Sequence, residues 1–387
     1  MRKKIAVLTA TRAEYGLLKN LVVSLIEMKE LDVEVVVTGA HLSPECGLTY
    51  KEIEKDGIPI AKKIDILLSS DTRASVSKSM GLAMIGFAEY FEENRPEALL
   101  VLGDRYETLA VCCAAMNAQI PIFHLYGGET TEGAVDEAIR HSITKMGYLH
   151  FTSTEAYRKR VIQLGENPER VFCVGALGIE NALRERKLSK KELSDKVGLD
   201  LTVPLGVVTF HPVTLENRAE TQCQELLKAI EYFTDYQFII TGANADYGGN
   251  LVNQMLSGFA QQHQNVHFTL SLGMETYLSA LNYAAFVLGN SSSGLLEVPS
   301  FGIPTINVGN RQKGRIKAES VLDCKAEAQD IIRTVRYAMS GSFREHIKDC
   351  VNPYGDGNTT EKIIRVIREE WLNKGINLQK KFYDISF

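Results

Sequence analysis

The sequence lacks the usual features of membrane proteins and of disulfide-stabilised secreted proteins. After a basic start, only the mostly apolar residues 5–10 precede Thr11, too few for a membrane span or for the core of a signal peptide. The 7 cysteines form no CxxC pair, and their odd number and scattered spacing argue against a disulfide framework and a zinc site. We therefore expect a cytoplasmic protein with buried thiols, no metal ion and no membrane contact.

An excess of positive charge is missing as well. The formal net charge is −5 and the pI is about 6.0, so no overall basic field would attract nucleic acid. An anionic substrate must then be bound by a local cluster of donors. The Gly-rich GxGxxG and P-loop fingerprints are not found where phosphate would bind, which argues against a nicotinamide-dependent enzyme and a kinase.

What the sequence does have is a regular alternation of short apolar runs and longer amphipathic segments. Its 387 residues are too many for one ordinary domain, and 45% of them are hydrophobic. The apolar runs are continuous, which is typical of strands covered on both faces and predicts an α/β fold with parallel, doubly wound sheets. We expect strands at 5–9, 33–38, 98–102, 120–124, 149–152 and 171–174, and again at 206–210, 237–241, 266–269, 286–288 and 305–308.

The composition changes between the two halves. Residues 184–204 begin with a charged stretch that is a poor strand former, and we interpret them as a linker between two Rossmann-like domains, 1–183 and 205–365. Residues 366–387 are expected to form a helix and tail that pack on the first domain. Ligands of open parallel sheets bind where the strands end, so the loops after the strands should carry the chemistry.

Three loops of the first half contain candidate ligand-binding residues. Arg12 lies where a helix begins, so its guanidinium and free backbone amides can share one anionic group. His41 follows the second strand. Asp104 and Arg105 follow the most apolar strand, beside a glycine that permits close approach of a ligand. Simpler interpretations are a surface charge, a structural histidine and an ion pair that closes the strand end.

A carboxylate-rich segment follows the fourth predicted strand. Gly127 and Gly128 favour a tight turn that presents Glu129, and Asp136 begins the next helix, where it would also serve as a simple N-cap. If Asp104, Glu129 and Asp136 converge at one sheet edge, their repulsion raises the pKa of at least one of them. A general acid or base that works near neutral pH needs such a shift.

The strongest signal of the second half is the segment Gly-Asn-Ser-Ser-Ser-Gly at 289–294. Small residues after a strand let backbone amides and the hydroxyls of Ser291 and Ser292 bind a diphosphate at the N-terminus of the next helix. Glu297 lies one turn further on, where a carboxylate can accept from two ribose hydroxyls. The alternative is a serine-rich turn that only caps a helix.

Three further residues of the second half are candidates for the same ligand. His211 precedes a proline that fixes the backbone, and we expect it to act in catalysis or ligand contact. Asn244 follows the next strand, and Arg311 adds a cation after the last predicted strand. A diphosphate site in the second half and carboxylates in the first predict a reaction on the group attached to the diphosphate.

A series of motifs runs in order through nearly the whole chain: Thr-Arg-Ala-Glu-Tyr-Gly, Leu-Gly-Asp-Arg-Tyr-Glu, Gly-Gly-Glu, Asp-Glu-Ala-Ile-Arg-His-Ser-Ile-Thr-Lys, Gly-Asn-Ser-Ser-Ser-Gly and Arg-Gln-Lys-Gly-Arg. Together they closely resemble the hydrolysing UDP-N-acetylglucosamine 2-epimerases, and among these the bacterial enzymes of sialic-acid capsule synthesis. One departure is Tyr126, where relatives have His or Glu.

The resemblance implies a glycosyltransferase-B-like fold with the substrate between two Rossmann-like domains. It implies conversion of UDP-N-acetylglucosamine and water to N-acetylmannosamine and UDP by anti-elimination to a glycal and hydration, without NAD or another cofactor and without an obligatory metal. Relatives suggest a homodimer or homotetramer. Asp104, Glu129 and Asp136 match the family's acid/base carboxylates. The positions that match its nucleotide-binding residues are Arg12, Arg105, His211, Asn244, Ser291, Ser292, Glu297 and Arg311; we add His41 as a further candidate.

Four other functions remain open on the sequence. One is a non-hydrolysing 2-epimerase of the same fold. Another is a hydrolysing relative that acts on a UDP-2,4-diacetamido-6-deoxy sugar for legionaminic acid. The third is a glycosyltransferase, which needs an acceptor, and the fourth is a sugar-nucleotide binding or sensor protein without turnover.

Overall fold

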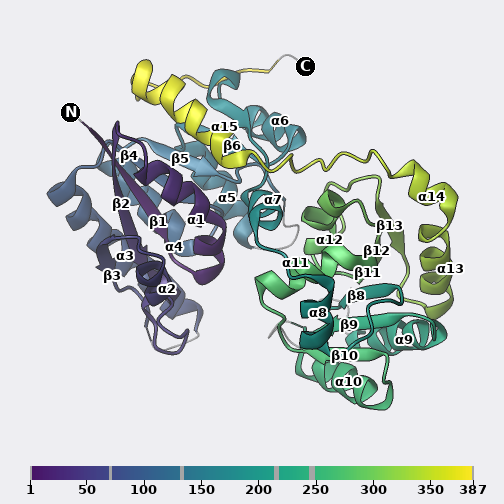
Figure 1. Ribbon diagram of the computed structural model, residues 1–387. Coiled ribbons are helices and arrows are strands. Elements are labelled where there is room, and N and C mark those ends of the chain that lie inside the picture. Colours follow the sequence, from purple (N-terminus) through teal and green to yellow (C-terminus); the bar gives the residue numbers. More distant parts are fainter. Residues whose placement is uncertain (1, 69–71, 131–134, 213–217, 244–248, 386–387) are drawn as a thin grey trace. The chain divides into compact units, whose positions relative to one another are not determined.

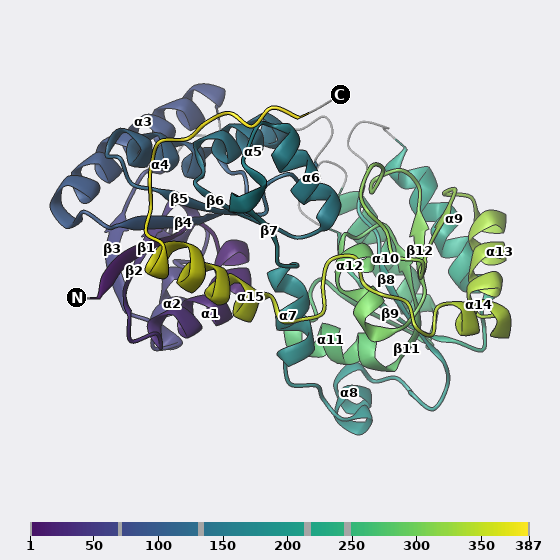
Figure 2. The same ribbon diagram turned by 90° about the horizontal axis from the view of Figure 1, so that it is seen from above.

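The computed structural model describes residues 2–68, 72–130, 135–212, 218–243 and 249–385 (Figures 1 and 2). The chain forms two compact units: unit 1 contains Met1–Asn181 and Gly357–Phe387, and unit 2 contains Ala182–Asp356. Each unit has one sheet in which the described strand pairs are parallel. The α/β class with two Rossmann-like parallel sheets is therefore confirmed.

Unit 1 has a seven-stranded sheet in which the first and the fourth strand of the chain are neighbours, and the strand order changes direction between these two. From edge to edge the strands are β3 (Ile60–Ile64), β2 (Leu31–Thr38), β1 (Lys3–Thr9), β4 (Ala98–Leu102), β5 (Ile122–Leu125), β6 (Leu149–Thr152) and β7 (Val171–Cys173). The helical segments are α1 (Arg12–Ile26), η1 (Gly39–Leu42), α2 (Tyr50–Lys55), α3 (Arg73–Asn94), α4 (Tyr106–Asn117), α5 (Val135–Met146), α6 (Glu155–Gln163), η2 (Pro168–Arg170), α7 (Leu177–Arg184), α15 (Thr359–Val366) and η4 (Ile367–Asn373).

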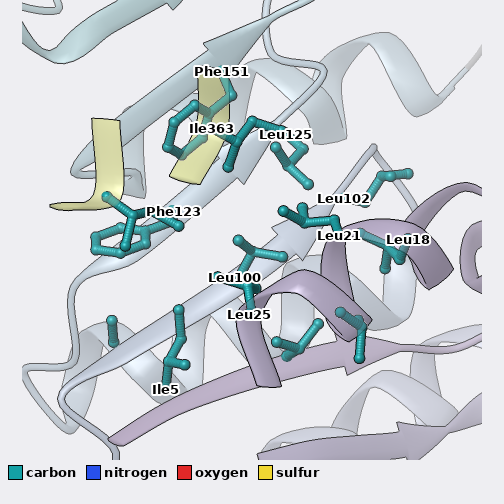
Figure 3. Close-up of a cluster of buried hydrophobic side chains, with 14 of the residues drawn as sticks. Ile5, Leu18, Leu21, Leu25, Leu100, Leu102, Phe123, Leu125, Phe151 and Ile363 are labelled. Atoms are coloured by element: carbon teal, nitrogen blue, oxygen red, sulfur yellow. The ribbon is translucent and has the colours of Figure 1, made fainter. Parts of the chain in front are cut away.

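Two apolar layers cover the two faces of this sheet, because successive residues of a strand point to opposite faces. Figure 3 shows one layer, in which leucines of α1 such as Leu21 and Leu25 pack over Ile5 and Leu100 of the sheet. Ile363 of α15 belongs to the same layer, so the C-terminal segment completes the core of unit 1. The other layer consists of α3, α4 and the alternate strand residues. Each fully buried side chain of this kind contributes about 1.5–3 kcal/mol.

Unit 2 repeats the architecture with six strands. Their order is β10 (Val266–Thr269), β9 (Gln237–Thr241), β8 (Leu205–Thr209), β11 (Ala284–Gly289), β12 (Thr305–Val308) and β13 (Val321–Cys324). The helical segments are α8 (Lys190–Val197), α9 (Ala219–Tyr232), α10 (Gly249–Gln262), α11 (Met274–Tyr283), α12 (Ser293–Leu296), η3 (Val298–Phe301), α13 (Ala328–Ala338) and α14 (Gly341–His346).

The structure adds detail to the expected linker and tail. Residues 184–204 contain α8, and Leu188 and Leu193 are buried in a core layer of unit 2, so this segment packs as part of that unit. The chain returns to unit 1 at Gly357, before the expected residue 366. In the described part of the chain, no helix has the length and apolarity that crossing a membrane requires.

Candidate active site

In unit 1, a buried arginine gathers the acidic residues at the ends of β4 and β5. We use the name carboxylate cluster for Asp104, Glu129, Asp136, Glu137 and Arg140. Arg140, in the second turn of α5, is only 5% exposed. It donates to Asp104 Oδ2, to the backbone carbonyl of Glu129 (2.9 Å) and to Glu137 Oε2 (3.1 Å). One guanidinium thus holds two loops and the start of a helix together.

The carboxylates of this cluster lie in different environments. Burial raises the pKa of Asp104, the nearby Arg140 lowers it, and the negative charge of Asp136 raises it again. Glu129 Oε1 accepts a hydrogen bond of 2.6 Å from the hydroxyl of Ser153. Asp136 is exposed on the first turn of α5. The cluster therefore combines a half-buried acid of raised pKa with a second carboxylate in solvent, as proton transfer in two directions requires.

The loop that carries Glu129 is built on a glycine that no other residue can replace. Gly128 has φ +79°, and a Cβ there would lie 2.4 Å from the carbonyl oxygen of Tyr157. Arg160 donates to the Gly128 carbonyl at 2.6 Å, which fixes the loop against α6. The side chain of Tyr126 packs against the core of unit 1, and its hydroxyl accepts from the backbone of Leu177 at 2.8 Å. Tyr126, which stands where relatives have His or Glu, therefore takes part in the packing of unit 1.

The remaining candidates of unit 1 lie at the ends of β1 and β2. Arg12 begins α1, and its side chain is 74% exposed with Nε 3.3 Å from Glu52 Oε1. His41 is fully buried: Nε2 lies 3.0 Å from the Thr9 hydroxyl and Nδ1 2.8 Å from the Thr49 hydroxyl. Burial lowers the pKa of His41 to about 4. Both ring nitrogens already have partners, so the structure gives no support to the expected nucleotide contact of His41, and a structural role explains it better.

In unit 2, the side chain and the backbone carbonyl of one asparagine together join three strand-end loops. We call His211, Asn290, Arg311 and Gln312 the Asn290 junction. Asn290 is 1% exposed; its amide accepts from the His211 backbone N–H (2.7 Å) and donates to the His211 carbonyl (2.8 Å). Its own carbonyl accepts from Arg311 (3.1 Å) and Gln312 (2.8 Å). The loops after β8, β11 and β12 are thereby fixed to one another.

The serine loop begins at Gly289, whose backbone conformation and close contact with a neighbouring strand leave no room for a side chain. Gly289 has φ +137°, and a Cβ there would lie 1.9 Å from the carbonyl oxygen of Thr209. Ser291 and Ser292 follow and are partly exposed. A helix begins directly after this loop, as expected, but α12 spans only Ser293–Leu296 and is followed by a 3₁₀ turn at Val298–Phe301. So short a helix has a weak macrodipole, and hydroxyls and loop amides are the donors that remain.

Glu297 has an acceptor that the protein leaves unused. Its Oε2 is buried and has no hydrogen-bond partner in the described part of the chain. Burial raises the pKa of Glu297, while Ser293 and the charge of Arg315 lower it. The Ser293 hydroxyl lies 2.8 Å from the hydroxyl of Tyr277. An unpaired buried carboxylate oxygen is costly unless a ligand supplies a donor. Asn244, the last candidate, lies outside the described residues.

Sequence reasoning missed the residues that organise both groups. Arg140, Asn290 and Gln312 all lie in the motifs described above, but the motifs by themselves assign no role to these three residues. The available signal for Asn290 was an amide directly after a strand-end glycine. For Arg140 it was the spacing of one helical turn from Glu137. What no spacing could reveal is that these side chains are buried and hydrogen-bond to loops far away in the sequence.

Two parallel-sheet units with polar clusters at their strand ends define an α/β protein of the glycosyltransferase-B-like class. The family model for UDP-N-acetylglucosamine 2-epimerase matches residues 24–368. The chain belongs to this family, as its motifs predicted.

Two curated relatives and one solved structure illustrate the likeness. The chain is 41% identical over 386 residues to the GDP/UDP-N,N'-diacetylbacillosamine 2-epimerase (hydrolyzing) of Campylobacter jejuni, covering 99% of this chain and 100% of that protein. It is 40% identical over 385 residues to the polysialic acid biosynthesis protein P7 of Escherichia coli, covering 99% and 98%. The crystal structure of the Neisseria meningitidis UDP-GlcNAc 2-epimerase bound to UDP-GlcNAc has a TM-score of 0.78 at 18% identity, covering 95% of this chain and 100% of that one. At that identity the likeness concerns the fold.

Proposed function

We propose that this enzyme hydrolyses UDP-N-acetylglucosamine to N-acetylmannosamine and UDP with inversion at C2, as a step that supplies sialic acid synthesis. The observation that carries the proposal is the carboxylate cluster around Arg140. A 2-epimerase must remove the proton at C2 and return one to the opposite face. Several acidic groups of different burial within reach of one buried cation suit this task.

Unit 2 supplies the proposed nucleotide site. The unused Oε2 of Glu297 suits a ribose hydroxyl, and the partly exposed Ser291 and Ser292 suit the diphosphate. Arg311, held by the carbonyl of Asn290, adds the positive charge that the leaving diphosphate requires. The role of His211 is then to contact the ligand next to this loop, because its backbone is fixed by Asn290.

The proposed reaction has two steps. In the first, a carboxylate takes the proton from C2 while the C1–O bond breaks, so that the electron pair of the C–H bond forms the C1–C2 double bond and UDP leaves with the electrons of the C1–O bond. In the second, water adds its oxygen to C1 and loses a proton, while a carboxylic acid protonates C2 from the other face. Asp104, Glu129 and Asp136 are the proposed acid/base groups and titrate as a coupled set.

The test is turnover of UDP-N-acetylglucosamine in D₂O followed by NMR. We expect free N-acetylmannosamine with deuterium at C2 and one UDP released for each sugar. Retention of protium at C2 would rule out the elimination route. Accumulation of UDP-N-acetylmannosamine without UDP would instead identify a non-hydrolysing epimerase. Tight UDP binding without any sugar released would point to a binding protein.

A second candidate substrate is a UDP-2,4-diacetamido-6-deoxy sugar. The Campylobacter jejuni relative at 41% identity and a Legionella pneumophila relative at 34% are both named as diacetylbacillosamine 2-epimerases (hydrolyzing). The two sugars differ at C4 and C6, and the nucleotide part is the same. Measuring kcat/KM for both substrates in one reaction mixture decides between them, because the better substrate is consumed first. We expect this to be UDP-N-acetylglucosamine, since the E. coli relative is named for polysialic acid biosynthesis.

A further inference from the structure

A second group of charged residues lies in unit 1 where the sheet order reverses. The strand order β2-β1-β4 places the ends of β1 and β4 side by side, with their connections running to opposite sides. Such a reversal is where open α/β sheets bind ligands. The group consists of Glu14 from the first turn of α1, and Arg105 and Glu107 at the start of α4. We call it the switch-point triad.

The two carboxylates are buried and the guanidinium is not. Glu107 is fully buried and Glu14 is 8% exposed, whereas the side chain of Arg105 is 43% exposed. Arg105 Nε donates to Glu107 Oε1 at 2.5 Å and lies 4.0 Å from Glu14 Oε1. Within the described chain, Nε is the part of this guanidinium that makes hydrogen bonds. Its terminal amino groups therefore stay available to an anion.

The triad contains two carboxylates around one guanidinium, and the hydrogen bonds of the described chain do not engage all of the carboxylate oxygens. Glu107 Oε2 is buried and has no hydrogen-bond partner in the described chain. Glu14 Oε2 closes the capping box of α1 by accepting from the backbone of Ala10 (2.7 Å) and Thr11 (3.2 Å). Burial raises the pKa of Glu14 to about 7, helped by the charge of Glu107 and opposed by Arg105. Burying two carboxylates beside one arginine costs free energy of folding, which indicates that the arrangement serves ligand binding rather than stability.

We propose that Glu107 and Glu14 are positioning residues for Arg105. Glu107 fixes the guanidinium so that its amino groups face a phosphate of the nucleotide sugar, and the proton on Glu14 sets how much positive charge Arg105 presents. The inference rests on the proposed function, to which it adds that Arg105, at a position that matches a nucleotide-binding residue of the family, contacts a phosphate. With Glu14 protonated, one carboxylate balances Arg105. With Glu14 ionised, two carboxylates oppose a single cation and the anionic ligand is held less tightly.

The first arm of the test measures binding of UDP by calorimetry and steady-state kinetics of the nucleotide sugar. Glu107→Gln retains the shape and removes one negative charge beside Arg105, but it replaces the charged hydrogen bond that orients the guanidinium with a weaker neutral one. The loss of orientation is expected to outweigh the gain in positive charge. We expect Kd for UDP and KM to rise by about 10-fold, with kcat changed by less than about 3-fold. Glu92→Gln, at the exposed end of α3, serves as the matched control. An unchanged Kd for UDP, or a fall in kcat alone, overturns the proposal.

The second arm follows KM between pH 6 and pH 8. Among the described residues, the charged groups of another element that shift the pKa of Glu14 are Arg105 and Glu107, while His41 of η1, with a pKa of about 4, stays neutral. As the pH rises through about 7, Glu14 ionises, so KM is expected to rise. In Glu14→Gln, which keeps the capping acceptor, KM should stay flat. The intact nucleotide sugar is used because UDP itself gains charge in this range.

Each outcome separates this inference from the proposed function. Wild-type protein without turnover refutes the function, while the UDP affinity of Glu107→Gln still tests the triad. If Glu107→Gln does not fold, the pH arm with Glu14→Gln decides. A KM that rises with pH equally in wild type and in Glu14→Gln overturns the role of Glu14.

Discussion

The strand-end loops of unit 1 and unit 2 are built with opposite chemistry on the same kind of sheet. In unit 1, acidic side chains surround the buried Arg140, which donates to Asp104, Glu137 and the carbonyl of Glu129. In unit 2, the loop after β11 is held by Asn290, whose neutral amide binds the backbone N–H and carbonyl of His211. The loops of unit 1 are thus held by ion pairs, and those of unit 2 are held by neutral hydrogen bonds that fix the backbone.

This difference follows from what each region is proposed to do. Proton transfer needs groups whose charge changes during the reaction and whose pKa depends on their neighbours. The diphosphate of an intact nucleotide sugar carries a constant charge near neutral pH, and it is best bound by donors that are fixed before it arrives. The comparison can be broken or sharpened by substitutions that are matched in the two units.

The largest effect is expected for Asp104→Asn. The carboxamide keeps the shape but cannot take up or release the proton, so turnover should fall by about 10³-fold. The affinity for UDP should stay within about twofold, because Asp104 is proposed to act on the sugar and the groups proposed to bind the nucleotide are left unchanged. UDP release and calorimetry measure the two quantities. An equal loss of both would mean that the two regions do not divide the work.

A loss of about 3 kcal/mol in the free energy of unfolding is expected for Arg140→Met, measured by urea denaturation. The change leaves the half-buried Asp104 and Glu137 without the buried cation that they share. Adding Asp104→Asn should restore part of the loss, which a double-mutant cycle quantifies. The control is Arg95→Met, whose exposed ion pair with Glu92 should contribute below about 1 kcal/mol. Full additivity of the two substitutions would contradict a shared cluster.

A smaller loss, about 2 kcal/mol, is expected for Gly289→Ala in unit 2. The new Cβ would meet the Thr209 carbonyl, and the serine loop must shift away from it. Gly16→Ala in α1 is the matched control: its Cβ meets nothing within 4 Å, so helix propensity should stabilise the protein by about 0.5–1 kcal/mol. Thermal unfolding compares the two, and a stable Gly289→Ala protein with normal UDP affinity would refute the role of the loop.

The smallest effect is expected for Asn290→Asp. The carboxylate loses the donor to the His211 carbonyl and adds negative charge beside the proposed diphosphate site. We expect Kd for UDP to rise by about 10-fold, and kcat on saturating substrate to change much less. Asn290→Asp and Asp104→Asn are the same exchange in opposite directions. If both lowered kcat rather than affinity, the proposed contrast between the units would be wrong.

Most of the fold could be predicted because central strands of parallel sheets are apolar on both faces. The two strands that the pattern missed, β3 and β13, are both edge strands. β3 contains exposed Lys62 and Lys63, and β13 contains exposed Asp323. An edge strand has one neighbour and more solvent, so its sequence does not need continuous apolarity. The segment 184–204 was interpreted as a linker for a similar reason, since its few apolar residues are spaced for one-sided burial.

The candidate site was predictable in part. Asp104, Glu129, Ser291 and Glu297 follow strands, and their positions at strand ends follow from the alternation alone. His41 has the same kind of position, yet its ring turns inward to Thr9 and Thr49. The side-chain direction within a loop depends on contacts with other loops, which the local sequence does not contain.

The sequence alone determined the two-sheet α/β architecture, the family and the loops that are proposed to carry the chemistry, because periodicity and motifs are local properties of the chain. Only the tertiary structure decided that Arg140, Asn290 and Glu107 are the buried centres of these loops. Burial and hydrogen bonding bring together segments far apart in the chain, and the pKa of a group depends on those neighbours rather than on its place in the sequence.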